Sequence, residues 1–329
     1  AHIGPEADGG VVLSGHTDVV PVDGQKWDSD PFTVTERQGK LYGRGTCDMK
    51  GFDALAIWAL IEAHKSGVAR PLQLALSYDE EVGCTGVRPM LHEMADWPVR
   101  PAGCFVGEPT NMQVITGHKH KISKRVVVRG RTGHSSLAPQ AVNAAEYAAR
   151  LVTYVSDLGR RLAADGPRDA LYDLPHTTAH VGRMTGGTQL NIVPHHAEFD
   201  FEFRSVGADD PDALLNEVMD EAKRLQKDMQ AIDPDSGIDF LPYSHIVGLD
   251  TDPEAEITVL AKKLAGRNDH AKVAYTTEGG LFADIAGIPT VVCGPGSIEQ
   301  AHKANEFIAL AELDKCDRFL AALIEHCSA

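Results

Sequence analysis

The chain has 329 residues, with 31 Lys or Arg against 47 Asp or Glu, so its formal net charge is −16 at pH 7. Hydrophobic residues make up 43% of the chain, enough for a sizeable core, and the length favours two domains or one domain with a large insertion. An acidic chain without a basic run is a poor partner for nucleic acid or an anionic membrane. With those two partners disfavoured, a small-molecule substrate is favoured. No apolar run approaches the roughly 20 residues that span a bilayer, so we expect a soluble protein.

The six cysteines are scattered along the chain and form no CxxC pair. The first residues show neither a basic start nor an apolar stretch of the kind found in signal peptides. This pattern is typical of a reducing compartment rather than of a disulfide framework. We therefore expect a cytoplasmic protein.

The first third of the chain alternates short apolar strands with amphipathic helices. Strands are predicted at 11–15, 71–78 and 103–107, and helices at 49–65 and, capped by Thr85, at 85–96. This alternation predicts an α/β fold with a mostly parallel, doubly wound sheet. Ligands bind beyond the carboxyl ends of such strands, where the chain places His16, Asp18, Glu80, Glu81 and Glu108. Asp48 stands at the start of the first helix.

The pattern changes near residue 118. The predicted order is strand, helix, strand, strand, helix, strand, over 122–131, 141–158, 176–181, 195–204, 210–231 and 238–241. This βαββαβ order predicts an inserted α+β ferredoxin-like domain at 118–242, within an α/β domain formed by 1–117 and 243–329. The α/β pattern returns with a helix through 264, a segment at 279–286, a strand at 289–293 and a last helix from 309.

Histidines and carboxylates at the strand ends form a mixed nitrogen and oxygen donor set that suits divalent cations such as zinc. His16 and Asp18, two residues apart on a strand, point the same way, so Asp18 can orient the imidazole. In the Glu80 and Glu81 pair, one carboxylate can bind metal while its neighbour moves a proton. The alternation does not decide which one does which. Outside this context a Glu-Glu pair after a strand is usually a solvated turn.

Other chemistries lack their motifs. The chain contains no GxxxxGK[ST] phosphate loop and no GxSxG nucleophile elbow, and the glycine-rich segment at 43–48 ends in Asp instead of completing GxGxxG. The segment from His92 resembles HExxH but lacks the second histidine, and it fits an ordinary amphipathic helix. Nucleotide binding and serine hydrolysis therefore lose support.

Six segments carry a resemblance to a known family. They are SGHTDVVPVDGQKW from Ser14, LYGRGTCDMKG from Leu41, YDEEVG from Tyr78, VGEPT from Val106, GRTGHSS from Gly130 and GPGSIEQAHKANEF from Gly294. Over nearly its whole length the chain resembles the di-zinc aminoacylase and carboxypeptidase superfamily, and within it most closely the acetylornithine deacetylases. The resemblance implies two Zn²⁺ ions per subunit, with Co²⁺ as a possible substitute.

The resemblance also implies the roles of individual residues. His16 and Glu108 would bind one zinc ion, Glu81 and His302 the other, and Asp48 would bridge them. Asp18 would orient His16, and Glu80 would be the general base.

In this family the inserted domain carries the contacts of a homodimer, and a histidine of the GHSS type reaches the partner's active site. His134 is that candidate here, and its alternative is a turn histidine packed against Pro139. Arg204 and Asn191 match positions that contact the substrate carboxylate, although Arg204 could equally form a surface ion pair. Gly294 and Gly296 would supply backbone near the substrate, or simply form a tight turn.

The activity implied by the resemblance is removal of the acetyl group from N2-acetyl-L-ornithine, a step in arginine biosynthesis. The alternatives are a succinyl-diaminopimelate desuccinylase, a broader aminoacylase or dipeptidase, and, outside this class, a metal-binding protein without catalysis. Two departures stand out. Related chains carry a further helix and strand ahead of the His16 motif, so the N-terminus is expected to be shortened, and the segment 243–253 lacks clear family character.

Overall fold

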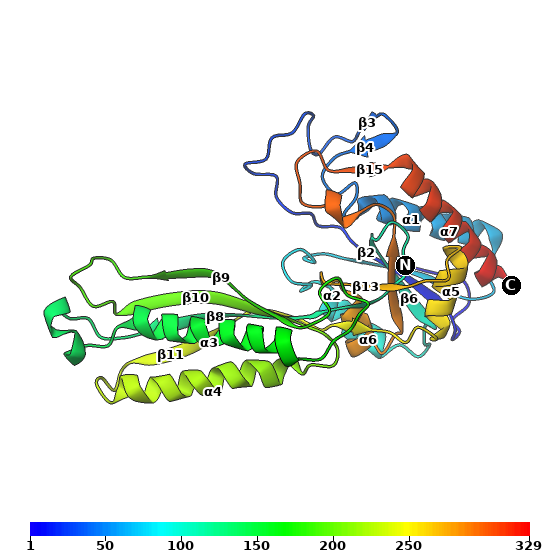
Figure 1. The fold of residues 1–329 in the computed structure, drawn as a ribbon. Helices are drawn as coiled ribbons and strands as arrows, with labels where there is room; N and C mark the ends of the chain where they lie inside the picture. Colours follow the sequence, from blue (N-terminus) through cyan, green and yellow to red (C-terminus); the bar gives the residue numbers. More distant parts are fainter. The chain divides into compact units, whose positions relative to one another are not determined.

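The computed structural model describes residues 1–329 and divides them into two compact units. The first, called here the discontinuous unit, comprises residues 1–118 and 247–329. The second, called the insert, comprises residues 119–246. Figure 1 shows the elements of both units in sequence colours. No helix is both long enough and apolar enough to cross a membrane.

The main sheet of the discontinuous unit has eight strands. Their order is β1-β5-β2-β6-β14-β7-β12, and β13 also pairs with β7. The strands are β1 His2–Ile3, β2 Val11–His16, β5 Leu72–Ser77, β6 Gly103–Pro109, β7 Ile115–His118, β12 Leu249–Asp250, β13 Ala271–Val273 and β14 Thr290–Gly294. Strands β5, β2, β6 and β14 run parallel to one another, whereas the pairs β1–β5, β14–β7 and β12–β7 are antiparallel.

Helices cover both faces of this sheet (Figure 1). They are α1 Lys50–Ser66, α2 Val87–Ala95, α5 Glu256–Leu264, α6 Gly279–Ile285 and α7 Leu310–Ser328. Helices α1, α5 and α7 share one apolar core with Leu13, Phe105 and Val291 of the main sheet. Along their strands these three residues alternate with other buried residues, whose side chains face the opposite side of the sheet. Gly67 caps the end of α1 with a φ of 74°, which glycine adopts easily.

A small antiparallel sheet accompanies the main one. It has the order β15-β4-β3, with β3 Thr35–Arg37, β4 Lys40–Tyr42 and β15 Phe307–Ala309. This sheet pairs β4, which precedes Asp48 in the chain, with β15, which follows His302. It thereby brings the loop containing Asp48 and the loop containing His302 to the same place.

The insert has the predicted order of elements. They are β8 His120–Arg129, α3 Ala144–Asp165, β9 Thr178–Gly186, β10 His196–Ser205, α4 Pro211–Gln230 and β11 Gly237–Ile246. The strands form an antiparallel sheet in the order β11-β8-β10-β9. Phe199, Phe201 and Phe203 on β10 are at most 2% exposed and pack with α3 and α4. Asn143 and Asp210 cap the starts of these helices with their side chains.

The predicted fold class, α/β with an α+β insertion of ferredoxin-like order, is confirmed. One local prediction is wrong: Thr85 does not cap α2. That helix begins at Val87 after Gly86 and has no side-chain cap, while the backbone N–H of Thr85 donates to Asp79 in a tight turn. Two 3-10 turns, Ser135–Gln140 and Ile298–Gln300, complete the structure.

Candidate metal centre

The discontinuous unit gathers the predicted ligands at one edge of its main sheet. Strands β2, β5 and β6 are parallel neighbours, so their carboxyl ends lie together. The loop before α1 and the loop before β15 reach the same edge. These elements deliver, in chain order, His16, Asp48, Glu81, Glu108 and His302.

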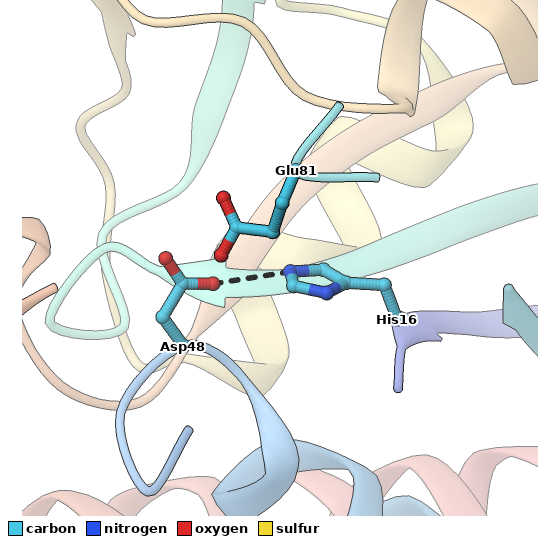
Figure 2. A group of neighbouring side chains, drawn as sticks. All are labelled: His16, Asp48 and Glu81. Atoms are coloured by element: carbon cyan, nitrogen blue, oxygen red, sulfur yellow. Dashed lines mark hydrogen bonds and ion pairs between the residues drawn. The ribbon is translucent and has the colours of Figure 1, made fainter. Parts of the chain in front are cut away.

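Asp48 lies between two histidines. Its Oδ1 is 3.1 Å from Nε2 of His16, and its Oδ2 is 3.2 Å from Nε2 of His302. Figure 2 shows Asp48 and Glu81 on the side of the His16 ring that carries Nε2. A carboxylate that offers one oxygen to each of two imidazoles has the placement of a bridge between two metal positions.

The His16 ring is held from its other nitrogen. Its Nδ1 lies 3.0 Å from the main-chain oxygen of Asp18 and 3.3 Å from Oδ1 of the same residue. This leaves Nε2 facing Asp48 and Glu108, whose Oε1 is 3.7 Å away. The Asp18 carboxylate also accepts the backbone N–H groups of Glu80 and Glu81, so it fixes the turn that carries both glutamates.

The second position groups His302 with Glu81. The Nε2 of His302 is 3.1 Å from Oε2 of Glu81, and the His302 side chain is 53% exposed, whereas Asp48 and Glu81 are 10% exposed or less. His302 adopts a positive φ of 64°, which non-glycine residues rarely do without support from their surroundings.

The donor set fits divalent cations. Two groups have ligand atoms that all lie within 4.8 Å of one another: His16, Asp48 and Glu81 form one, and His16, Glu80 and Glu108 form the other. Imidazole nitrogens and carboxylate oxygens are the ligands of zinc and of related borderline metals. Several buried carboxylates at such short range also need positive charge to offset their repulsion.

The electrostatics of the cluster reflect this crowding. Burial raises the pKa of Glu80 to about 7, with the Glu81 carboxylate adding to the rise. Burial and the Asp48 carboxylate hold the pKa of Glu108 well above its usual value.

The histidines and Asp48 are shifted in the opposite sense. Burial alone would lower the pKa of His16, but its hydrogen bond to Asp48 and the charge of Glu108 raise the pKa to about 11. Hydrogen bonds to Asp48 and Glu81 raise the pKa of His302 to about 10. Burial would raise the pKa of Asp48, yet its two histidine partners lower the pKa to about 2. Positive charge is thus favoured next to the bridging carboxylate.

The two adjacent glutamates differ in their contacts. Glu81 faces His302, whereas Oε1 of Glu80 accepts a hydrogen bond from the Cys84 thiol, with Sγ 3.3 Å away. Cys84 is fully buried, and burial together with the Glu80 charge raises the pKa of its thiol, so it remains a donor. The sequence pattern did not single out Cys84.

The two glycines of the GPGS segment allow close packing beside the ligands. A Cβ on Gly294 would lie 2.0 Å from the main-chain oxygen of Gly107, and one on Gly296 would lie 2.6 Å from Sγ of Cys47. Gly296 also has a φ of 83°, and its N–H donates to Glu312. Any side chain at either position would displace strand β6 or the loop containing Asp48.

The other three predicted residues belong to the insert. Nδ1 of His134 lies 2.8 Å from Oγ of Ser136 and accepts the backbone N–H of the same residue, so His134 caps the following 3-10 turn. The main-chain oxygen of Asn191 accepts the N–H of Ser135. Arg204 donates from Nε to Oε1 of Glu202 at 2.9 Å, which is the ion pair its alternative interpretation predicted.

Two further residues beside the ligands gave no sequence signal. Glu278 is 2% exposed, its Oε1 has no hydrogen-bond partner, and burial raises its pKa to about 8. Tyr275 donates to the main-chain oxygen of Pro109 at 3.5 Å, and burial together with the charge of Glu108 raises the pKa of its hydroxyl. Both follow a short edge strand whose three residues carry no readable period.

A layered α/β fold with an insert and a cluster of His, Asp and Glu at the strand ends defines a class, the metal-dependent hydrolases with paired metal positions. The chain belongs to peptidase family M20/M25/M40, whose family model matches residues 12–326. It is similar to curated proteins named acetylornithine deacetylase. That of Photorhabdus laumondii is 34% identical over 321 residues, and that of Proteus mirabilis is also 34% identical. The alignments cover 97% of this chain and 80% and 79% of those proteins.

Solved structures agree on the fold. Aminopeptidase PepT from Bacillus cereus superposes with a TM-score of 0.76 at 21% identity, over 100% of this chain and 84% of that one. The M20 family metallo-carboxypeptidase Sso-CP2 from Sulfolobus solfataricus has a TM-score of 0.74 at 20% identity, over 99% and 86%. The YXEP protein of Bacillus subtilis, described as a dinuclear metal-binding peptidase from the M20 family, has a TM-score of 0.63 at 14% identity, over 99% and 84%.

Proposed function

We propose that this chain hydrolyses N2-acetyl-L-ornithine to L-ornithine and acetate, the step that the curated relatives carry in their name. The observation that carries the proposal is the placement of Asp48, which offers one carboxylate oxygen to His16 and the other to His302. Such an arrangement suits two adjacent metal ions.

In this proposal His16, Glu108 and Asp48 would hold one metal ion, and Glu81, His302 and Asp48 would hold the other. Zinc is the proposed native ion and cobalt a functional substitute, because both suit a nitrogen and oxygen donor set. When bound, paired ions of this kind supply an activated water and polarise the acyl carbonyl.

The proton transfers belong to Glu80. Its carboxylate takes a proton from the attacking water as the new C–O bond forms at the acetyl carbon. It holds that proton on a carboxyl oxygen and passes it to the departing amine nitrogen as the C–N bond breaks, so acetate and the free amine leave. Cys84 keeps Oε1 of Glu80 in place through its thiol, and Asp18 keeps His16 oriented.

The insert is proposed to act across a homodimer. His134 of the partner subunit would stabilise the oxyanion that forms at the acetyl carbonyl, and Arg204 with Asn191 would bind the substrate carboxylate. In that case Arg204 would exchange its pairing with Glu202 for the ligand. The backbone at Gly294 and Gly296 would line the substrate site. Accordingly, 118–242 is proposed as the dimerisation domain and the remainder as the catalytic domain.

A cytoplasmic location is proposed on the chemistry of the cysteines. All six are free and buried in the structure. Reduced thiols of this kind persist in the cytoplasm, where glutathione and thioredoxin prevent disulfide formation.

The proposal is tested by offering the zinc-loaded protein three substrates: N2-acetyl-L-ornithine, N-succinyl-diaminopimelate and a simple dipeptide. Each reaction has a chelator-treated control. A metal-dependent preference for the acetyl substrate, measured as kcat/KM, is expected. A preference for the succinyl substrate or the dipeptide would move the protein to another activity of the same family. No hydrolysis of any of the three by protein with bound metal would contradict the proposal.

A further inference from the structure

A buried ion pair that the proposed chemistry does not use lies behind the metal ligands. Nη1 of Arg44 is 2.7 Å from Oε2 of Glu306, and both side chains are 1% exposed. Arg44 lies four residues before Asp48, and Glu306 lies four residues after His302. The pair therefore joins the two loops that supply these ligands.

Glu306 fixes the Asp48 loop directly. Its second carboxylate oxygen, Oε1, accepts the backbone N–H groups of Cys47 at 2.9 Å and of Asp48 at 3.1 Å. Its main-chain oxygen accepts the N–H of Gly43 at 3.0 Å. The backbone from which the Asp48 carboxylate projects is thus held by charge-assisted hydrogen bonds, which are stronger than neutral ones.

Arg44 fixes the His302 loop. Its guanidinium donates to the main-chain oxygen of Lys303 at 3.3 Å and to Oε1 of Gln25 at 2.7 Å. The amide nitrogen of Gln25 in turn donates to the main-chain oxygen of His302 at 3.0 Å. A planar guanidinium presents five N–H donors in a rigid fork, so one side chain can make these contacts at once. The network thereby holds two successive carbonyl groups, those of His302 and Lys303, directly after the positive φ of His302.

A purely structural role explains this network less well. A buried ion pair contributes little net stability, because removing two charges from water offsets most of their attraction. What the pair does provide is a fixed separation between two loops that lie far apart in the chain. Both ends of that separation are candidate metal ligands of the same ion.

We propose that Arg44, Glu306 and Gln25 are positioning residues that set the distance between Asp48 and His302, and with it the affinity for the metal ion that these two share with Glu81. The inference rests on the proposed function, since it takes those residues as ligands. It assigns the affinity of one metal position to side chains that do not themselves bind metal.

The test measures zinc affinity in the full chain. Metal-free wild type, Gln25→Ala and Glu306→Gln are titrated with Zn²⁺ against a chromophoric chelator, and their melting temperatures are recorded. The matched control is Gln73→Ala, which removes a buried glutamine on β5 whose Nε2 lies 3.2 Å from Nδ1 of His2. Both test variants should weaken one of the two zinc equivalents about 10- to 100-fold, the usual effect of losing an outer hydrogen bond to a ligand. The control should bind zinc like wild type.

The readout separates positioning from stability. Unchanged zinc affinities in both test variants, with or without a lower melting temperature, would overturn the inference. If Glu306→Gln fails to fold, Gln25→Ala decides alone, because Gln25 is half-buried in a loop and its removal leaves the ion pair intact. Failure of the proposed function looks different. Wild type itself would then bind fewer than two zinc ions, or zinc-loaded wild type would hydrolyse none of the three substrates, whatever the zinc affinities of the variants.

Discussion

Replacing Glu80 with glutamine isolates the proposed proton transfer. Glutamine has nearly the same shape, and its amide oxygen can still accept the Cys84 thiol hydrogen bond. It cannot take a proton from water. Burial, and after it the Glu81 carboxylate, raises the pKa of Glu80, so a neutral side chain removes a buried charge and its repulsion in the metal-free protein. Glu80→Gln should therefore lose turnover without losing stability.

General acid–base catalysis contributes about 10²- to 10⁴-fold to rate, which corresponds to about 2.7–5.4 kcal/mol of activation free energy. The kcat of Glu80→Gln on N2-acetyl-L-ornithine should fall by this factor, while KM changes little because Glu80 is not proposed to bind substrate. Bound zinc, measured by inductively coupled plasma mass spectrometry, should remain at two ions per chain. The melting temperature of the metal-free variant should equal or exceed that of wild type.

The matched control is Glu62→Gln, which neutralises a half-buried carboxylate of α1 that pairs with Lys65. It should leave kcat unchanged. Two results would refute the reasoning about Glu80. One is a Glu80→Gln variant with more than about a tenth of wild-type kcat. The other is loss of a zinc ion from Glu80→Gln but not from Glu81→Gln, which would exchange the roles of the two glutamates.

Three further predictions concern the insert. Mixed dimers of inactive Glu80→Ala and His134→Ala subunits should regain activity, because one of their two sites is complete, and no regain would show that His134 does not act on the partner. Arg204→Met should raise KM more than it lowers kcat, because it removes the proposed contact with the substrate carboxylate. Unchanged kinetics would contradict that contact and leave Arg204 with its ion pair to Glu202 as its only role. Phe201→Ala should lower the unfolding free energy of the insert by about 3–5 kcal/mol, because the ring is 2% exposed and packs edge-on against Phe203. Denaturant titration measures this loss, and a clearly smaller loss would contradict the prediction.

The location of most candidate ligands follows from local sequence. His16 and Glu108 come at the ends of apolar runs, and parallel strands place such ends at one edge of a sheet. Asp48 precedes a helix whose apolar spacing and terminal glycine are both readable. The alternating phenylalanines around Phe201 likewise predict the buried face of the insert.

The remaining features depend on contacts between distant segments. His302 follows no long strand or helix, so only the family resemblance pointed to it. The Arg44 to Glu306 pair spans 262 residues, and no local pattern encodes it. The strands that bring these loops together, β4 and β15, have three residues each, too few for a period of two to show. Glu278 directly precedes α6 and is 2% exposed, yet no local period marks it as buried.

The most direct test of the central claim is a zinc titration of the metal-free protein in which bound zinc and hydrolysis of N2-acetyl-L-ornithine are followed together. The account predicts tight binding of two ions per chain, activity that rises until two equivalents are bound, and loss of that activity on chelation. Binding of fewer than two ions, or hydrolysis that persists at the wild-type rate after the metal has been removed, would contradict it.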